Sequence, residues 1–295
     1  MSIADIKIGQ PDLLRVIHKE LQDLPPLPSI VVQAMETVNN PSASAADLNR
    51  LIAMDPALSA KVLRVVNSAH YGFSSQITTI SHAIVILGFD SVRNLVTALG
   101  VGRALRPSAR HLLNRQRFWE HSVATAVGTA VIGKRRRLDT AICEEVFVGG
   151  LLHDMGKLFL DQFFPDQYRV AIQLAIVGKV GMYRAEATAL GIDHTQVGKR
   201  IADNWRLPPA ANAMITFHHK PQLSGRYFEY VACVHAANVV AKQLKLGSSG
   251  DTVAPTMDAE VAKWLAFSPA DWESVNQTVT VEFEKARELV SVMGA

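Results

Sequence analysis

Cysteine is scarce in this sequence, which contains only Cys143 and Cys233 among its 295 residues. The two do not form the paired spacing of a zinc site, and nothing in the pattern requires a disulfide between them. Such sparing use of cysteine is typical of a reducing compartment. We therefore expect a cytoplasmic location.

Long apolar runs are also missing from the sequence. No stretch approaches the roughly 20 consecutive apolar residues of a membrane span. Residues 1–9 contain Asp5 and Lys7 in place of the apolar core of a signal peptide. We therefore expect no membrane among the partners.

Charge of one sign is not in large excess either. The formal net charge is +3, which is too small to indicate a nucleic acid as partner. We interpret the strongest basic run, Lys134 to Arg137, as the solvated end of a helix, where basic side chains favour the helix dipole. No aromatic residues alternate with it, as they do on nucleic-acid platforms. Nucleic acid is therefore not an expected partner, and a steep fall of affinity with salt would be its signature.

Alternation of polar and apolar residues, the signal of β-strands, is hard to find, whereas nearly every segment has helical periodicity. With 48% hydrophobic and 19% charged residues, the chain can bury a large core. We predict an all-α fold without internal repeats. The helices are expected over residues 11–23, 29–39, 45–54, 56–69, 81–88, 90–105, 109–136, 140–164, 166–177, 181–190, 193–205, 208–219, 227–244 and 269–293.

Capping residues support several of these helix starts. Ser44, Ser81 and Asp90 are expected as N-caps, and Asp55 is the strongest case because Pro56 follows it. Residues 246–255 are rich in small residues such as Gly and Ser, so we expect an exposed loop there.

The sequence around His153-Asp154 is unusual because an imidazole and a carboxylate lie side by side within an apolar segment. The apolar run 146–152 leads into the pair, and residues 158–160 continue it after Lys157. An unpaired carboxylate in an apolar setting is costly. A divalent cation such as Mn, Fe, Zn or Ni would explain the pair, since both groups are good ligands. The alternative is an ion pair between Asp154 and Lys157 on one helix, which the dipeptide alone favours.

Five further histidines are candidates for the same chemistry. Taken singly, each fits a hydrogen-bonded structural role, and a cationic His219 would favour the end of its helix. Together with His153 and Asp154, four of the five occupy four predicted helices that could converge, as helices do in metal-binding bundles. The residues alone leave the metal site and the structural interpretation equally open. The five are His121, His194, His218, His219 and His235.

The first half of the sequence contains a Pro-rich stretch at 24–28, Asp-Pro-Ala-Leu at 55–58, an Asn-Ser-Ala-x-Tyr-Gly pattern within 62–72, and apolar positions over 77–88. Through these motifs the sequence, from about residue 24 to residue 220, resembles the HDOD family, the HD-related output domains of bacterial signalling proteins. The resemblance implies an all-helical HDOD domain over 24–220, with an N-terminal helical part (24–107) and an HD-like part (108–220). Residues 1–23 would form a preceding helix. Residues 221–295 would form a helical extension that packs on the HD-like part.

The second half is similar to the wider HD superfamily of metal-dependent phosphohydrolases, which includes the HD-GYP cyclic dinucleotide phosphodiesterases. The resemblance implies one or two divalent transition-metal ions (Fe, Mn, Ni or Zn), with Asp154 bridging them. It also implies that Lys157 contacts a substrate phosphate, as a point cation would, while paired ions activate a water. The positions that match metal ligands are His121, His153, Asp154, His194, His218 and His219.

Three departures from the HD-GYP pattern bear on activity. Asn238 aligns with the final aspartate ligand, Arg117 stands where a glutamate is found, and residues 220–223 lack the Gly-Tyr-Pro signature. We therefore expect a regulatory HDOD protein with signalling proteins as partners and a metal centre that is catalytically degenerate. The alternative is an active phosphohydrolase on a nucleotide or another small phosphate ester, with Asp154 and Lys157 as catalytic residues.

Overall fold

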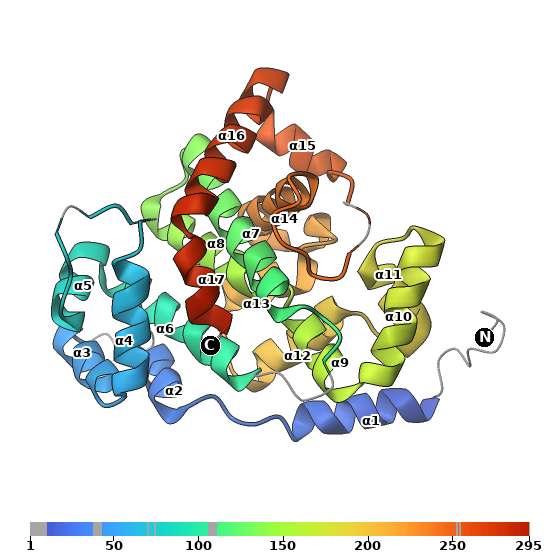
Figure 1. Ribbon diagram of the computed structural model, residues 1–295, viewed down its shortest axis with the longest axis horizontal. Helices are drawn as coiled ribbons and strands as arrows, with labels where there is room; N and C mark the ends of the chain where they lie inside the picture. The colour runs from blue at the N-terminus through green and yellow to red at the C-terminus, as the bar shows by residue number, and fades with distance from the viewer. Residues whose placement is uncertain are drawn as a thin grey trace.

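The computed structural model describes residues 11–37, 43–69, 71–73, 75–105, 111–251, 253 and 255–294. Every regular element within these ranges is a helix, and none of these residues forms a strand (Figure 1). The predicted all-α fold is confirmed, because helical periodicity in the sequence reflects the faces that the helices bury.

The first part of the chain consists of short helices with tight connections. They are α1 (Pro11–Gln22), α2 (Ser29–Glu36), α3 (Ala45–Ala53), α4 (Pro56–Val66), α5 (Ile80–Leu87) and α6 (Phe89–Ala104). α6 is buried along most of its length and contacts α2, α4 and α5. The Asn67 amide fixes the chain after α4, because it hydrogen-bonds to backbone groups of Leu63 and Ile77.

Two of the four expected N-caps occur as predicted. The Ser44 hydroxyl and the Asp55 carboxylate each accept a hydrogen bond from a backbone N–H in the first turn of the following helix. The prediction for Ser81 is wrong, since α5 begins at Ile80 and Thr79, two residues earlier, is its N-cap. The prediction for Asp90 is also wrong, because α6 begins at Phe89 and the Asp90 carboxylate instead forms an ion pair within the helix.

The second part is built around the long helix α7, which lies at the centre of the molecule (Figure 1). α8 and α14 both pack against α7 and also contact each other and α13. The helices here are α7 (Arg115–Arg135), α8 (Thr140–Leu152), α9 (Met155–Phe163), α10 (Pro165–Gly178), α11 (Met182–Leu190), α12 (His194–Asn204), α13 (Pro209–Phe217), η3 (Pro221–Leu223), η4 (Gly225–Tyr227) and α14 (Phe228–Gln243).

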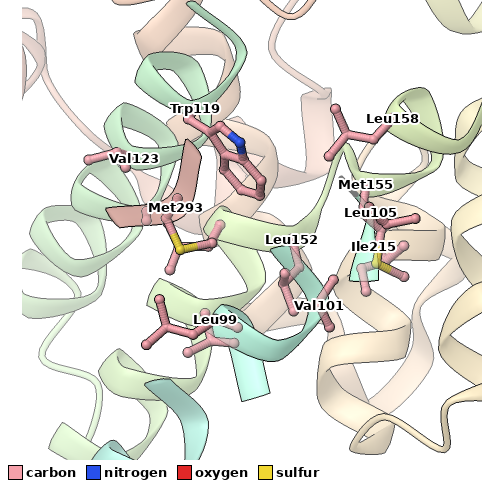
Figure 2. Packing of buried hydrophobic residues seen from close by; sticks show 14 of the residues in the cluster. Leu99, Val101, Leu105, Trp119, Val123, Leu152, Met155, Leu158, Ile215 and Met293 are labelled. Atoms are coloured by element: carbon pink, nitrogen blue, oxygen red, sulfur yellow. The ribbon is translucent and has the colours of Figure 1, made fainter. Parts of the chain in front are cut away.

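The last part contains α15 (Ala259–Leu265), α16 (Pro269–Lys285) and α17 (Arg287–Gly294). α16 and α17 both pack on α7, and α17 also reaches α4 and α6 of the first part. Figure 2 shows Met293 of α17 beside Trp119 of α7, and both side chains lie within 4 Å of the Cβ position of Gly102 on α6. The C-terminal helix thus joins the two halves of the molecule through one continuous core.

The structure corrects several predicted boundaries. The helix predicted over 140–164 is broken at His153-Asp154, and the one over 269–293 is broken at Ala286. α15 is not predicted, and α7 begins at Arg115, six residues later than expected. The predicted positions 38–39 and 109–110 lie outside the described residues. The expected exposed loop is instead half-buried over 246–251, and Ser249 within it is only 1% exposed.

Among the described residues, no single helix is both long and apolar enough to cross a membrane. α5 and α6 together have the length and composition of a span, but they are bent by 119° at their junction. Most of α6 is buried against other helices of the protein.

Candidate metal centre

The pair His153-Asp154 occupies the break between α8 and α9. Asp154 has φ −96° and ψ 9°, in the bridge region that many active-site residues adopt. The break turns the side chains of both residues toward histidines of α7, of the start of α12 and of the residues directly after α13. The site is therefore formed by a local interruption of the helix that the sequence predicted as continuous.

Two glycines allow the neighbouring helices to come close enough. A Cβ atom at Gly150 would lie 2.6 Å from the Cα of Ala126 on α7, and one at Gly156 would lie 2.0 Å from the carbonyl oxygen of His194 on α12. Real Cβ atoms do not make such contacts, so only glycine fits at these positions. The glycines on both sides of the pair thus bring His121 and His194 within reach of Asp154.

The two carboxylate oxygens of Asp154 face different sets of imidazoles. Oδ1 lies 3.2 Å from Nε2 of His194 and 3.6 Å from Nε2 of His218. Oδ2 lies 3.3 Å from Nε2 of His153 and 3.7 Å from Nε2 of His121. Asp154 therefore stands between two groups of nitrogen atoms, which is the position of a bridging ligand.

These separations fit a metal ion. Ligand atoms bound at 2.0–2.2 Å around one ion are about 3.0–3.5 Å from each other, and Nε2 of His194 lies 3.4 Å from Nε2 of His218. Two groups of residues could each hold an ion, because the potential ligand atoms inside each group all lie within 4.8 Å of one another. The first contains Asp154, His194, His218 and His219, and the second contains His121, His153 and Asp154.

Hydrogen bonds on the far side of the rings fix which nitrogen faces the centre. Nδ1 of His153 lies 2.8 Å from the carbonyl oxygen of Gly150, and Nδ1 of His218 lies 2.9 Å from that of Ile215. A carbonyl oxygen only accepts, so Nδ1 carries the hydrogen in both rings. The Nε2 lone pairs are then directed at Asp154, as in rings that bind a metal through Nε2.

His194 is held in the same way by a carboxylate. Its Nδ1 donates to Oε2 of Glu186 at 2.5 Å, and its backbone N–H donates to the same oxygen at 2.8 Å. The hydroxyl of Tyr168 donates to the other oxygen of Glu186. This arrangement orients His194 and raises the basicity of its Nε2, as carboxylates do for metal-bound histidines.

Several nitrogen and oxygen atoms that could bind a metal ion are buried in the centre without a hydrogen-bond partner. They include Nε2 of His121, of His153 and of His219, and Oδ1 of Asp154. Buried polar atoms without partners are rare in proteins and indicate a bound ion, a water or a functional role. Asp154 and His153 are 0% exposed, so their potential ligand atoms are shielded from solvent while they face one another.

The charge state of the centre follows from burial and from its ionic neighbours. Burial opposes the charged form of Asp154, but His153 and Lys157 together lower its pKa well below the usual value. Burial opposes the charged form of His194 too, yet Glu186 raises its pKa to about 9. Burial lowers the pKa of His218 to about 3 and keeps that of His121 well below its usual value. At neutral pH the centre therefore offers the Asp154 carboxylate and neutral imidazoles at His121 and His218, whereas His194 is protonated.

The ion pair between Asp154 and Lys157, which the sequence offers as the alternative to a metal site, is also present. Nζ of Lys157 lies 3.0 Å from Oδ2 of Asp154 and 2.6 Å from Oδ2 of Asp251. The Lys157 side chain is fully buried. One ammonium group does not account for the imidazoles on the opposite side of Asp154, so the ion pair accompanies the histidine cluster and does not replace it.

Among the five further histidines that the sequence offers as candidates, His235 lies outside the group that surrounds Asp154. Its Nδ1 donates a hydrogen bond to the carbonyl oxygen of His218, and its Nε2 accepts a hydrogen bond from the backbone N–H of Asp258. With both nitrogens occupied, His235 positions the backbone beside the centre and has no lone pair left for an ion. Asn238, one turn further along α14, is fully buried with both amide atoms unpartnered.

Sequence reasoning missed three charged groups near the centre. Glu186 orients His194, while Asp251 accepts hydrogen bonds from both Lys157 and Lys242. Nothing in the local sequence distinguishes these residues from surface charges on helices and loops. The only local signal is the glycine-rich composition around Asp251, which is typical of an exposed loop.

The basic run 134–137 packs on the last helices. Arg135 forms an ion pair with Asp271, and the Arg136 guanidinium lies 4.7 Å from the ring centre of Trp264. These contacts stabilise the C-terminal part against the end of α7. They give both arginines an intramolecular role.

Comparison with known proteins agrees with this architecture. A family model described as the HDOD domain matches residues 24–221. A protein of Treponema pallidum (strain Nichols), named only as uncharacterized, is 25% identical over 241 residues, covering 81% of this chain and 46% of that protein. This chain thus spans about half the length of that curated relative.

Solved structures show the same fold. An HDOD domain protein of unknown function from Geobacter sulfurreducens has a TM-score of 0.75 at 24% identity, with 96% of this chain and 97% of that chain covered. A protein from Shewanella amazonensis SB2B, described provisionally as a phosphohydrolase, has a TM-score of 0.73 at 23% identity, with 94% and 97% covered. One from Marinobacter aquaeolei VT8, described provisionally as a signal transduction protein, has a TM-score of 0.75 at 21% identity, with 100% and 69% covered.

The fold and the site together define an all-helical protein with a buried His/Asp group that could hold a metal. Since the family model covers more than half of the sequence, the chain belongs to the HDOD family.

Proposed function

We propose that this protein is a regulatory HDOD protein whose His/Asp centre holds one or two divalent transition-metal ions, with Asp154 as the shared ligand. The observation that carries the proposal is the convergence of donors from α7, the α8–α9 break, α12 and the end of α13 on one carboxylate. A nitrogen-rich donor set with a carboxylate suits Fe, Mn, Ni or Zn. His121 and His153 would hold one ion, and His194, His218 and His219 the other.

A regulatory role is favoured by the way the centre is closed. Its donors are almost completely buried, and Lys157 is neutralised by Asp154 and Asp251. An amide at Asn238 would be a weaker, neutral ligand in place of a carboxylate. We infer that the ions stabilise one arrangement of the helices that signalling proteins recognise. The free thiols of Cys143 and Cys233 fit the reducing cytoplasm as the location of this activity.

An active phosphohydrolase is the second candidate, and the position of Lys157 favours it. Its ammonium group lies 3.0 Å from Asp154, where it could neutralise a phosphate beside the metal ligands. When bound, paired ions polarise a phosphoryl oxygen and lower the pKa of a water. In this protein Asp154 would position the ions, and Lys157 would bind the phosphate of a nucleotide or another small phosphate ester.

Metal analysis tests the proposal. We expect protein purified without chelators to carry Mn, Fe, Ni or Zn near stoichiometry, and the double variant His153→Ala/Asp154→Ala to lose it. The exposed His82 provides a control, since His82→Ala should retain the metal. Wild-type protein that carries no transition metal, and takes up none on addition, would refute the metal centre.

Turnover of an aryl phosphate diester separates the two functions. If the protein is a phosphohydrolase, the metal-loaded wild type hydrolyses the diester and the double variant does not. Regulation without catalysis predicts no turnover in either, with metal still bound to the wild type. Equal turnover in both proteins would assign the activity to another site or a contaminant.

A further inference from the structure

The segment 246–251, which we call the plug, follows α14 and contacts α7 at Arg117 and His121 and α9 at Lys157. The backbone N–H of Ser248 donates to the carbonyl oxygen of Arg117 at 2.8 Å, and the Arg117 guanidinium donates to the carbonyl oxygen of Gly247 at 3.3 Å. Gly247 has φ +74°, and a Cβ atom there would lie 2.2 Å from the backbone nitrogen of His121. The plug is therefore seated against the same turn of α7 that supplies a candidate metal ligand.

The plug places one carboxylate, that of Asp251, among three hydrogen-bond donors. Oδ2 of Asp251 accepts from Nζ of Lys157 at 2.6 Å and from Nζ of Lys242 at 2.7 Å. Oδ1 accepts from the backbone N–H of Met182, the first residue of α11, at 3.0 Å. Ser249 adds a hydroxyl 3.1 Å from Nζ of Lys157. The hydrogen-bond donors come from α9, α14 and α11 and meet at this one carboxylate.

Burial makes this site different from a surface ion pair. The side-chain exposures are 0% for Lys157, 8% for Lys242 and 4% for Asp251. Two buried ammonium groups require negative charge, because a buried charge without a partner is costly. Within the group, Asp154 and Asp251 supply that charge. If Asp251 were absent, the group would keep an excess of positive charge. Asp154 would then be the only carboxylate left in the group for the ammonium groups of Lys157 and Lys242, and the N–H of Met182 would lose its acceptor.

The three donors match the chemistry of a phosphoryl group. Phosphate oxygens accept several charge-assisted hydrogen bonds at once, and helix N-termini and lysines are their common partners. Lys157 also contacts Asp154, so an anion bound in place of Asp251 would lie next to the candidate metal ligands. A carboxylate from the chain itself holds this position.

We propose that the plug is an internal competitor: Asp251 occupies an anion site made by Lys157, Lys242 and the N–H of Met182, and a small phosphate-bearing molecule binds there by displacing it. This deepens the proposed function by assigning the class of ligand that acts at the centre. It rests on that function only for the metal ions beside the phosphate, since all the donors to the anion belong to the protein.

Inorganic phosphate in metal-free, chelator-treated protein is the probe. Asp251→Asn removes the competing charge with little change in shape, and it should tighten phosphate binding about tenfold, because a larger fraction of molecules then has the site open. Adding Lys242→Gln to this variant should abolish the gain. Asp203→Asn is the control, because Asp203 also pairs with a lysine, Lys199, but on the surface, and it should leave phosphate binding unchanged. Titration calorimetry measures all four proteins.

A second variant displaces the plug without changing any charge. Gly247→Ala should lift it from α7 and tighten phosphate binding in the same direction. Gly225→Ala is the matched control, because Gly225 also has a positive φ, of +56°, but its Cβ position has no neighbour within 4 Å. This control introduces the same backbone strain, and it should leave phosphate binding at the wild-type value.

Hydrogen exchange of the wild-type protein tests the proposal without any substitution. Phosphate should accelerate exchange of the amides of residues 247–251, whereas chloride at equal ionic strength should not. Unchanged exchange at high phosphate, or folded Asp251→Asn protein that binds phosphate no better than wild type, would overturn the proposal and make the Asp251 contacts purely structural. Because these experiments use metal-free protein, their failure is distinct from failure to bind metal, which elemental analysis measures separately.

Discussion

At the scale of single residues, Asp154 determines the chemistry of the centre because each of its oxygens faces its own set of imidazoles. The sequence identified the carboxylate and the histidines that surround it, since their types and their apolar setting are visible in the chain. It did not reveal Glu186, whose role depends on α11 lying beside the start of α12. Contacts of that kind depend on tertiary packing, which local patterns do not encode.

The protonation of His194 makes metal binding dependent on pH. With a pKa of about 9 in the metal-free protein, Nε2 of His194 carries a proton at neutral pH. An incoming ion must displace this proton, so the apparent affinity should rise about tenfold per pH unit up to the pKa and then level off. Competition with a fluorescent zinc chelator between pH 6.5 and 9.5 measures the slope. Affinity independent of pH would contradict this role of His194.

Glu186 should act on the metal through His194. Burial opposes the charged imidazole, and the Glu186 carboxylate is the main group that raises the pKa. In the Glu186→Gln variant, the pH above which the metal affinity no longer rises should therefore be lower than in the wild type. At pH 9.5, where the proton no longer competes, binding should be weaker by about tenfold to a hundredfold, because the ring loses its carboxylate partner. A purely structural role for Glu186 would leave the pH profile unmoved.

At the scale of elements, the break between α8 and α9 lets one chain segment present its side chains to three other helices. Periodicity predicted helix on both sides of His153-Asp154, because both sides are apolar and neither contains proline. The break itself was not predicted, since no proline or positive-φ glycine marks it. The plug was missed for a related reason: its small residues are typical of exposed loops, yet here they allow close approach to α7.

Gly156 tests whether close contact of α9 with α12 forms the site. In Gly156→Ala, the new methyl group would collide with the carbonyl oxygen of His194, so the two helices must separate. We expect a loss of about 1–3 kcal/mol in the free energy of unfolding, together with loss of bound metal. Chemical denaturation and elemental analysis measure the two effects.

Gly178 provides the control for this substitution. It also lies in a helix, but a Cβ atom there would make only ordinary contacts, at 3.6 Å, with Val180. Gly178→Ala should therefore leave metal content unchanged and should not reduce stability, because alanine favours helix more than glycine does. Equal effects of the two substitutions would mean that the contact at Gly156 has no special role.

At the scale of the whole molecule, the centre depends on contacts between residues far apart in the sequence. Lys157 and Asp251 are 94 positions apart, and the plug returns to α7 across 130 positions at Arg117 and Gly247. The sequence predicted the helical class and the family, because these follow from local periodicity and from motifs. It could not predict which helices meet, since that depends on the packing of the complete chain.

The way α17 joins the two halves suggests how a regulatory state could be shared. α17 contacts α7, which carries His121, and also α4 and α6 of the first part. An ion that holds α7 against α8 and α12 would also hold α17, which packs on α7. It would thereby hold the surface on which α4 and α6 of the first part pack. The division of the chain into an N-terminal part, an HD-like part and a C-terminal extension remains a proposal at this scale.

Anomalous diffraction from crystals of metal-loaded protein tests the central claim most directly. The account predicts a peak on each side of Asp154, one bonded to His194 and His218 and the other to His121 and His153, about 3.5–4 Å apart as in two-metal sites. One peak bonded to Asp154 would reduce the centre to a single ion. Saturating metal with no peak within bonding distance of Asp154 would contradict the account.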